Sequence, residues 1–238
     1  MRESVRSGVL VAGLMAVALA APAADRKYSD VQGTERVTVA RPERPLSAIT
    51  TQGGLTFYTD RTVFNTAHPG LPIENFSGTL VPANGVATCT GATLNAATNN
   101  ECFAPGGIRP GISVVNSTGG DLVILTPPFI GVPCVSAGPN LFADASELQF
   151  TPPVAAVGLD FEANTPAAFT VTVFSPAGSL GTTTVTGAIP GVFWGVDTAD
   201  PAGISRITFN VAGENGELFC NVAFGEPVPV ELQSFTIQ

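Results

Sequence analysis

The chain has 238 residues, of which 10 are basic and 19 are acidic, and its formal net charge at pH 7 is −9. The imbalance grows from Pro45 onward, where three arginines (Arg61, Arg109 and Arg206) stand against 14 acidic residues and give −11. Nucleic-acid binding depends on cationic side chains that displace counterions from phosphate, so this composition excludes nucleic acid as a partner. A body of this length is sufficient for one domain with a single core.

Residues 1–24 have the pattern of a secretory signal peptide. Arg2 and Arg6 precede an uncharged apolar run, and alanines at 18, 20, 21 and 23 provide the small residues that a signal peptidase requires. The run of roughly 13 residues is shorter than the about 20 needed to span a bilayer. We therefore expect export with cleavage, no transmembrane segment afterwards, and a secreted, extracellular or cell-envelope location.

Residues 25–52 are rich in both charges and contain Pro42 and Pro45, without a sustained apolar period. This composition is typical of a flexible segment, so we predict a leader outside the fold. The predicted domain then covers residues 53–238.

Short β-strands separated by Gly and Pro turns dominate this domain. Phe169, Val171 and Val173 alternate with threonines, as in a strand with one buried face. The Asn215-Gly216 pair favours a tight hairpin between two such strands. The pattern predicts an all-β, antiparallel, jelly-roll-like β-sandwich with one short helix near residues 60–67, which Asp60 or Thr59 can cap.

All four cysteines lie in the exported part, and an even number in an oxidising compartment indicates two disulfides. Four cysteines allow three pairings. A bond between Cys89 and Cys102 would order a polar, Asn-rich loop, which leaves Cys134 for Cys220. Cys220 is expected to point inward, because it shares its parity with Val222 and Phe224. The spacings contain no C-x₂-C pair, which disfavours zinc.

Sequence motifs for catalysis are absent: there is no G-x-S-x-G, no H-E-x-x-H and no phosphate-binding glycine loop. His68 precedes a Pro-Gly pair and is expected in a loop or at a helix end. Asp160 and Glu162 share a strand face, and such pairs are commoner on solvated faces than in glycoside hydrolase sites. We therefore predict no catalytic residues and no enzymatic activity, with a glycoside hydrolase as the third interpretation.

Glycan binding is the second interpretation, because sandwiches of this type often stack sugars on exposed aromatic rings. Phe193 and Trp194 are adjacent in a strand, so at most one of them faces solvent. An exposed Trp194 would be the best sugar platform, and the alternative is that it fills the core. Asn116 and other loop asparagines can hydrogen-bond to sugars, although they equally stabilise turns.

A series of weak motifs between Leu55 and Gly225 resembles a family of secreted bacterial β-sandwich domains. These motifs are Phe57-x-x-Asp60-x-x-x-Phe64, Leu71-Pro-Ile-Glu-Asn-Phe-Ser-Gly78, Val157-Gly-Leu-Asp-Phe161, Phe193-Trp-Gly-Val196, Ile204-x-x-Ile-x-Phe209 and Asn221-Val-Ala-Phe-Gly225. Such domains occur in PEP-CTERM (exosortase-sorted) surface proteins and have no established activity. The resemblance implies a lectin-like jelly roll outside the cytoplasm. The chain departs from the family in two ways: it ends in Pro229-Val-Glu-Leu232 and six further residues instead of a sorting signal, and it has Cys220 where the family often has aspartate.

Related sandwiches commonly hold a structural calcium ion near the first and last strands, and the resemblance places Glu74, Asn75 and Asn221 there. Oxygen ligands of this kind suit calcium, although Cys220 removes one carboxylate. No other cofactor is expected. The leading interpretation is thus a non-enzymatic surface or matrix protein whose partner is a glycan or another envelope component.

Overall fold

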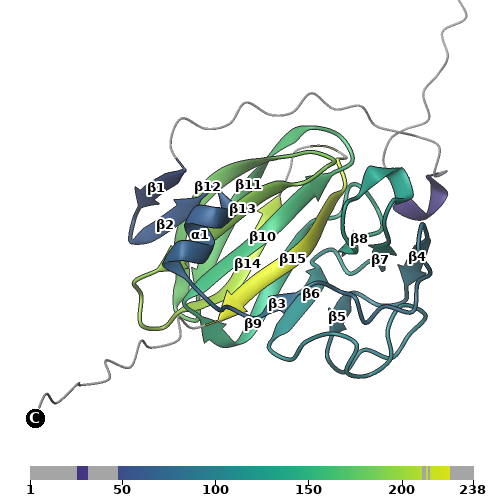
Figure 1. The fold of residues 1–238 in the computed structure, drawn as a ribbon, viewed down its shortest axis with the longest axis horizontal. Coiled ribbons are helices and arrows are strands. Elements are labelled where there is room, and N and C mark those ends of the chain that lie inside the picture. Colours follow the sequence, from purple (N-terminus) through teal and green to yellow (C-terminus); the bar gives the residue numbers. More distant parts are fainter. Residues whose placement is uncertain (1–25, 32–47, 211–212, 214, 226–238) are drawn as a thin grey trace, which may run out of the picture.

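The computed structural model describes residues 26–31, 48–210, 213 and 215–225. The predicted signal peptide lies outside these residues. The described part forms two antiparallel sheets that are stacked face to face (Figure 1). The predicted β-sandwich is confirmed. No helix among the described residues combines the length and the apolar character that crossing a bilayer would require.

The first sheet has nine strands. Eight of them follow one another in the order β1 (Ile49–Gln52), β2 (Leu55–Tyr58), β13 (Val192–Thr198), β10 (Ala156–Ala163), β15 (Glu217–Gly225), β8 (Ser136–Pro139), β7 (Leu122–Leu125) and β4 (Val86–Cys89), and β3 (Ile73–Glu74) also pairs with β15.

The second sheet has six strands. Their order is β12 (Gly178–Gly187), β11 (Ala167–Ser175), β14 (Ile204–Asn210), β9 (Ser146–Val154), β6 (Ile112–Asn116) and β5 (Thr93–Asn95).

The main core lies between the two sheets and is built from alternate residues of their strands. On β11, Phe169, Val171 and Val173 are fully buried, whereas Thr170 is exposed. Phe161 of the first sheet stacks on Phe209 of the second, with 5.2 Å between the ring centroids. The predicted alternation is therefore correct, because each strand has one dry face.

The predicted helix is present as α1 (Arg61–Ala67) and lies on the outer face of the nine-stranded sheet (Figure 1). The Asp60 carboxylate caps it by accepting the backbone N–H groups of Thr62 and Val63. Phe64 packs directly on Gly158 and Gly195, where a Cβ atom would lie 2.6 Å and 2.9 Å from its ring. These two glycines therefore allow the helix to sit close to the sheet.

Two parts of the predicted flexible leader belong to the fold, which corrects that prediction. Residues 26–31 contain the 3₁₀ turn η2 (Tyr28–Asp30), in which Tyr28 is 0% exposed and its hydroxyl donates to the Gly216 carbonyl at 2.7 Å. Strand β1 pairs along its whole length with β2. A buried aromatic ring and a ladder of backbone hydrogen bonds order these segments despite their polar surroundings. Residues 32–47 and 226–238 lie outside the described part.

Both predicted disulfides are present, Cys89–Cys102 and Cys134–Cys220. The expected orientation of Cys220 is wrong, however, because a β-bulge places one extra residue in β15. Ala223 pairs with Gly158 but Cys220 pairs with Asp160, and Asn221 at the bulge has a φ of 48°. Cys220 is therefore buried on the outer side of the sheet, whereas Val222 belongs to the main core.

The Asn215-Gly216 pair does not form the predicted hairpin. Strand β14 belongs to the six-stranded sheet and β15 to the nine-stranded sheet, so this connection crosses from one sheet to the other. The carbonyls of both residues accept the backbone N–H of Asn164 instead.

Candidate functional site

Trp194 is not the predicted sugar platform. Its side chain is 3% exposed and lies in the main core, with its ring centroid 6.2 Å from that of Phe57 and 5.9 Å from that of Phe209. The alternation along β13 turns Phe193 outward instead, where the Arg61 guanidinium covers it at 4.6 Å from the ring centroid. The core interpretation of Trp194 is therefore correct.

Asn116 is also unavailable to a ligand. It is buried at the end of β6, where its Nδ2 donates to the Asp144 carboxylate at 2.6 Å. Its Oδ1 accepts the backbone N–H of Thr118 at 3.0 Å. The side chain stabilises a turn, which corrects its assignment as a ligand-binding residue.

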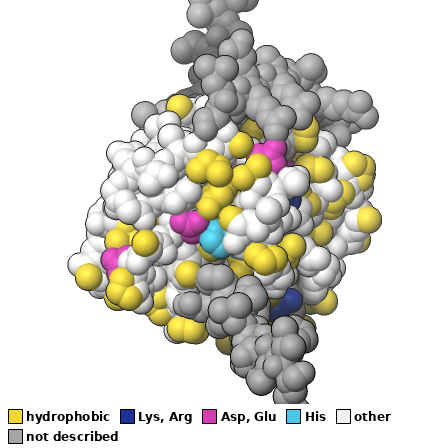
Figure 2. Space-filling model, turned by 60° about the vertical axis from the view of Figure 1, so that its left-hand side comes forward, with side chains coloured by type: hydrophobic (Ala, Val, Ile, Leu, Met, Phe, Trp, Pro, Cys, Tyr) yellow, Lys and Arg dark blue, Asp and Glu magenta, His cyan; other side chains and the backbone are white. Residues whose placement is uncertain are grey.

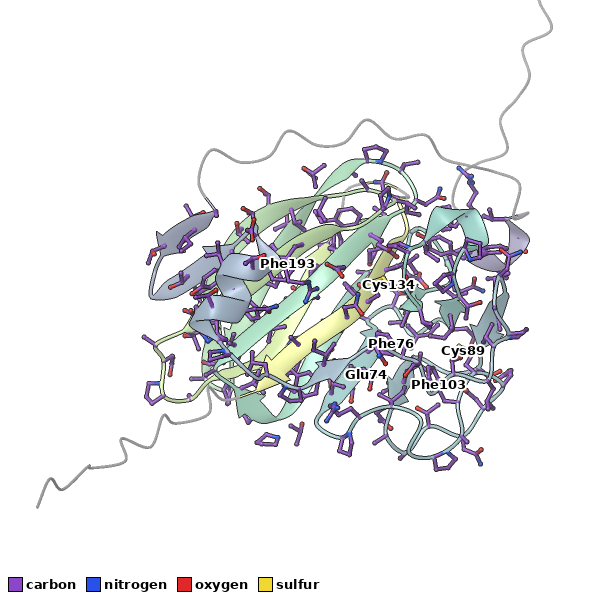
Figure 3. The ribbon with its side chains drawn as sticks, in the orientation of Figure 1. Glu74, Phe76, Cys89, Phe103, Cys134 and Phe193 are labelled. Carbon is purple, nitrogen blue, oxygen red and sulfur yellow. A yellow bond between two sulfur atoms is a disulfide. The ribbon has the colours of Figure 1, made fainter. Side chains whose placement is uncertain are left out.

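A groove of about 400 Å³ opens between the β3 segment and the loop that precedes β6. Figure 3 shows Glu74 and Phe76 on the segment that forms one wall. The groove is lined by Ile73, Glu74, Asn75, Ser77, Gly78, Gly106, Gly107, Ile108, Arg109 and Pro110. Polar side chains, glycine backbone and an Ile73 side chain that is 44% exposed thus meet in one concavity that is wide open to solvent.

Glycine backbones bring the two walls into contact. A Cβ atom added at Gly78 would lie 2.2 Å from the Gly107 carbonyl oxygen, so no larger residue fits there without moving the backbone. The following Gly106-Gly107 turn includes a φ of +84° at Gly106, which favours glycine. The shape of the groove therefore depends on this Gly-rich loop.

The Glu74 carboxylate joins the two walls. It is buried, and its two oxygens accept the backbone N–H groups of Phe76 and Arg109. On the same wall, the Oδ1 of Asn75 accepts the backbone N–H of Ser77 at 3.1 Å. Of the three residues named in the calcium prediction, Glu74 thus joins the two walls and Asn75 stabilises one of them.

Calcium binding stays a prediction, and its three residues are engaged in hydrogen bonds of their own in this structure. The oxygens of Glu74 face N–H donors, where a cation would need free oxygen ligands. Asn221 lies at the bulge of β15 and donates its Nδ2 to Asp160 at 2.9 Å, so it does not join Glu74 and Asn75. The bulge is the physical reason, because it directs Asn221 toward Asp160.

Arg109 differs in its partners from Arg61 and Arg206, the other two arginines after Pro45. Arg61 forms an ion pair with Asp160 at 2.9 Å, and Arg206 forms one with Glu147 at 3.3 Å. Each of these two guanidinium groups also covers a phenylalanine ring. Arg109 is exposed and has no ion pair within the described part of the chain. One lining residue of the groove is thus an exposed arginine without a charged partner among the described residues.

Arg109 was not singled out from the sequence. The signal was present in the run Gly106-Gly107-Ile108-Arg109-Pro110-Gly111, which places a scarce cation of an acidic protein inside a glycine-rich loop. Its relation to Glu74 required the fold, because 35 positions separate the two residues.

Two glutamates on the nine-stranded sheet are buried acids. Burial raises the pKa of Glu162 to about 8, and burial raises the pKa of Glu217 to about 8 as well. Serine hydroxyls bond to both, Ser136 to Glu162 and Ser146 to Glu217. Glu162 is 0% exposed, so the Asp160 and Glu162 pair is not arranged around an open cleft.

His68 has a packing position at the end of α1. Its Nε2 lies 2.9 Å from an Asp197 oxygen that also accepts the Tyr58 hydroxyl at 2.6 Å. Figure 2 shows the histidine beside an acidic side chain, on a face where uncharged and hydrophobic side chains predominate. These contacts connect α1 to β2 and β13.

One set of potential metal ligands occurs among the described residues, outside the groove. A sulfur atom of Cys134, one of Cys220 and a carboxylate oxygen of Glu162 lie within 4.8 Å of one another. Both sulfur atoms are engaged in the disulfide.

No family model and no curated protein matches the chain. Among solved structures, a variant of a family 29 carbohydrate-binding module studied for ligand recognition is similar with 14% identity and a TM-score of 0.30, covering 61% of this chain and 99% of that one. The enzymatically active domain of tailspike protein 4 of bacteriophage CBA120 is similar with 15% identity and a TM-score of 0.27, covering 64% of this chain and 20% of that one. Similarities at this level do not assign a function.

Proposed function

We propose that this chain is an exported, non-enzymatic glycan-binding module of the cell surface or extracellular matrix, and that the groove beside β3 holds the sugar. The observation that carries the proposal is that Arg109, which has no ion pair among the described residues, lines a polar groove of about 400 Å³. This places the second interpretation of the sequence ahead of a surface role without a ligand.

The chemistry of the lining suits a sugar. Sugar hydroxyls donate and accept hydrogen bonds, and Arg109, Asn75 and Ser77 offer planar or flexible partners for them. Ile73 and Pro110 provide apolar contact for the C–H face of a sugar ring. Because Glu74 and the two glycines hold the walls together, the groove is formed before a ligand binds, which reduces the entropic cost of binding.

The non-enzymatic part of the proposal is supported by where the acidic groups lie. Glu162 and Glu217 have the raised pKa values of potential proton donors, but both are buried. Glu74 uses both of its oxygens to accept backbone N–H groups. A hydrolase would instead place two carboxyl groups about 5 to 9.5 Å apart around an accessible bond.

Export is supported by the two disulfides, which persist in oxidising compartments. Sequencing the amino terminus of the protein recovered outside the cytoplasm tests this part. We expect a new terminus between residues 21 and 25, and a chain that keeps Met1 would contradict export with cleavage.

The binding proposal is tested by screening the exported protein on a glycan array that contains neutral and acidic oligosaccharides. The best glycan is then used in affinity electrophoresis with two variants of exposed aliphatic residues on the same segment. Ile73→Ser changes a groove wall, whereas Leu80→Ser changes a side chain that is 59% exposed outside the groove.

We expect Ile73→Ser to weaken retardation in the glycan gel and Leu80→Ser to leave it unchanged. An array without any bound glycan would favour the surface role without a ligand. Equal retardation of both variants would show that the glycan binds elsewhere.

A further inference from the structure

The Cys134–Cys220 disulfide has an unusual neighbour. The Glu162 Oε1 atom lies 3.9 Å from the Sγ of Cys134, on a carboxyl group that is 0% exposed (Figure 3 shows the position of Cys134). The other oxygen of Glu162 lies 2.5 Å from the Ser136 hydroxyl. Two sulfur atoms, a carboxylate and a hydroxyl are thus gathered where β8, β10 and β15 meet.

The two disulfides differ in this respect. Potential ligand atoms of Cys134, Glu162 and Cys220 lie within 4.8 Å of one another. Among the described residues, neither Cys89 nor Cys102 belongs to such a group of potential metal ligands. They differ in access as well, because Cys134 is partly exposed whereas Cys89, Cys102 and Cys220 are fully buried. The Cys134–Cys220 bond therefore has one partly exposed residue that a reductant in solution can approach, whereas both residues of the other bond are buried.

We propose that reduction of the Cys134–Cys220 disulfide turns this cluster into a binding site for one thiophilic divalent cation, such as Zn²⁺ or Cd²⁺. The two cysteine thiolates and the Glu162 carboxylate supply three ligands, and the Ser136 hydroxyl or a water molecule supplies the fourth. Sulfur and carboxylate donors in a four-coordinate shell are a combination that zinc accepts in proteins.

The chemistry balances with a dithiol as the reductant. A thiolate of the dithiol attacks the Cys134 sulfur, Cys220 leaves, and the second thiol closes the dithiol into a cyclic disulfide. The protein gains two electrons and two protons and ends with two thiols. When the cation binds, it displaces the thiol protons and the Glu162 carboxyl proton into solvent.

The test measures Cd²⁺ binding to the full exported protein after reduction with a phosphine, which consumes water, becomes a phosphine oxide and does not compete for the metal as a dithiol would. The ultraviolet thiolate-to-cadmium absorption reports the bound ion. We expect one tightly bound Cd²⁺ per reduced chain and none per oxidised chain. A double variant, Cys134→Ser with Cys220→Ser, keeps Cys89 and Cys102 as a matched control and should show no such absorption after the same reduction.

The variant Glu162→Gln measures how much the carboxylate contributes to Cd²⁺ affinity while both thiols are kept. Loss of an outer-shell partner typically costs 10- to 100-fold in metal affinity, so loss of this direct ligand should weaken Cd²⁺ binding by at least about tenfold. It should also lower the number of protons released. The proposal is overturned if Glu162→Gln binds as tightly as the unchanged protein, or if the double variant binds equally well.

Reduction alone could unfold the chain, so the near-ultraviolet circular dichroism of the buried aromatic residues is recorded in parallel. A reduced protein that is unfolded, and whose native signal returns with one equivalent of Cd²⁺, supports the proposal. A reduced protein that remains unfolded with Cd²⁺ contradicts it.

Discussion

At the scale of single residues, the local environment assigns different roles to chemically identical side chains. Arg61 and Arg206 each pair with a carboxylate and cover an aromatic ring, and only Arg109 among the arginines of the body is left open within the described residues. A charged group that hydrogen-bonds to a ligand contributes about 1.5 to 3 kcal/mol. We therefore expect this one side chain to dominate the affinity of the groove.

Gly78 is the residue on which the shape of the groove depends. In Gly78→Ala the new methyl group would lie 2.2 Å from the Gly107 carbonyl oxygen, and the backbone of one wall must move. Overpacking of this kind costs about 1 to 3 kcal/mol, so we expect a lower free energy of unfolding and weaker glycan binding together. Urea denaturation and affinity electrophoresis measure the two effects.

Ser77→Ala is the matched control for the urea measurement alone, because Ser77 itself lines the groove. Ser77 is exposed and lies next to Gly78, and its backbone N–H bond to Asn75 is kept. An unchanged urea midpoint is expected. If Gly78→Ala also left both the midpoint and the binding unchanged, contact between the two walls would not matter for the groove.

At the scale of secondary-structure elements, the segment 26–31 packs against the sandwich as a part of the fold. Tyr28 fills a site formed by Phe142 and Gly216, with 4.4 Å between the two ring centroids. The backbone N–H of Tyr28 and the carbonyl of Arg26 bond to Asn140 and Phe142, respectively. The first residues after the predicted cleavage site are therefore fixed to the sandwich.

Tyr28→Phe tests how much this anchor contributes. The ring remains, but the buried Gly216 carbonyl loses its hydroxyl donor, and an unsatisfied buried acceptor costs about 1 to 3 kcal/mol. We expect thermal unfolding at a lower temperature. Tyr58→Phe, which removes a hydroxyl from partly exposed Asp197, should cost less. If Tyr28→Phe lowered the unfolding temperature no more than Tyr58→Phe does, the buried Tyr28 hydroxyl would add little stability to the 26–31 segment.

Much of the element pattern could be predicted from the sequence, because it depends on local periodicity and capping. The alternation on β11, the helix after Asp60 and the two disulfide pairs were all predicted correctly. The errors arose where distant strands decide the outcome. One extra residue in β15 inverted the orientation of Cys220 and directed Asn221 toward Asp160.

The candidate site was less accessible to sequence reasoning than the fold. The side-chain period predicts that Phe193 and Trp194 lie on opposite faces, but it does not tell which face is dry. Glu74 and Asn75 were singled out only as ligands of a calcium ion, which stays a prediction. Their actual partners are backbone N–H groups, and a backbone group leaves no signal in the residue pattern.

At the scale of the whole molecule, two buried carboxyl groups make the stability of the fold depend on pH. The pKa values of Glu162 and Glu217 are raised to about 8 by burial, from an ordinary value of 4.5. A carboxyl group whose pKa is raised in the folded state contributes stability that is fully present below about pH 4.5. That contribution is lost as the pH rises toward 8, because the unfolded chain then releases protons that the folded chain retains.

We therefore expect the free energy of unfolding to be larger at pH 5 than at pH 8, by an amount on the order of a few kcal/mol. Urea denaturation across this range measures it. Glu162→Gln and Glu217→Gln replace each acid with a neutral group of similar shape, so each should flatten the pH dependence. A stability curve that rises from pH 5 to pH 8, or is unaffected by both substitutions, would show that the two carboxyl groups ionise without cost.

The most direct measurement of the central claim is a calorimetric titration of the purified protein and its Arg109→Gln variant with the array-selected glycan. Since the loss of a charged hydrogen bond corresponds to about tenfold or more in affinity, we predict a dissociation constant at least about ten times higher for the variant. The thermal unfolding temperature should stay the same, because the Arg109 side chain is exposed and has no ion pair within the described residues. Equal dissociation constants for the two proteins would contradict glycan binding in the groove.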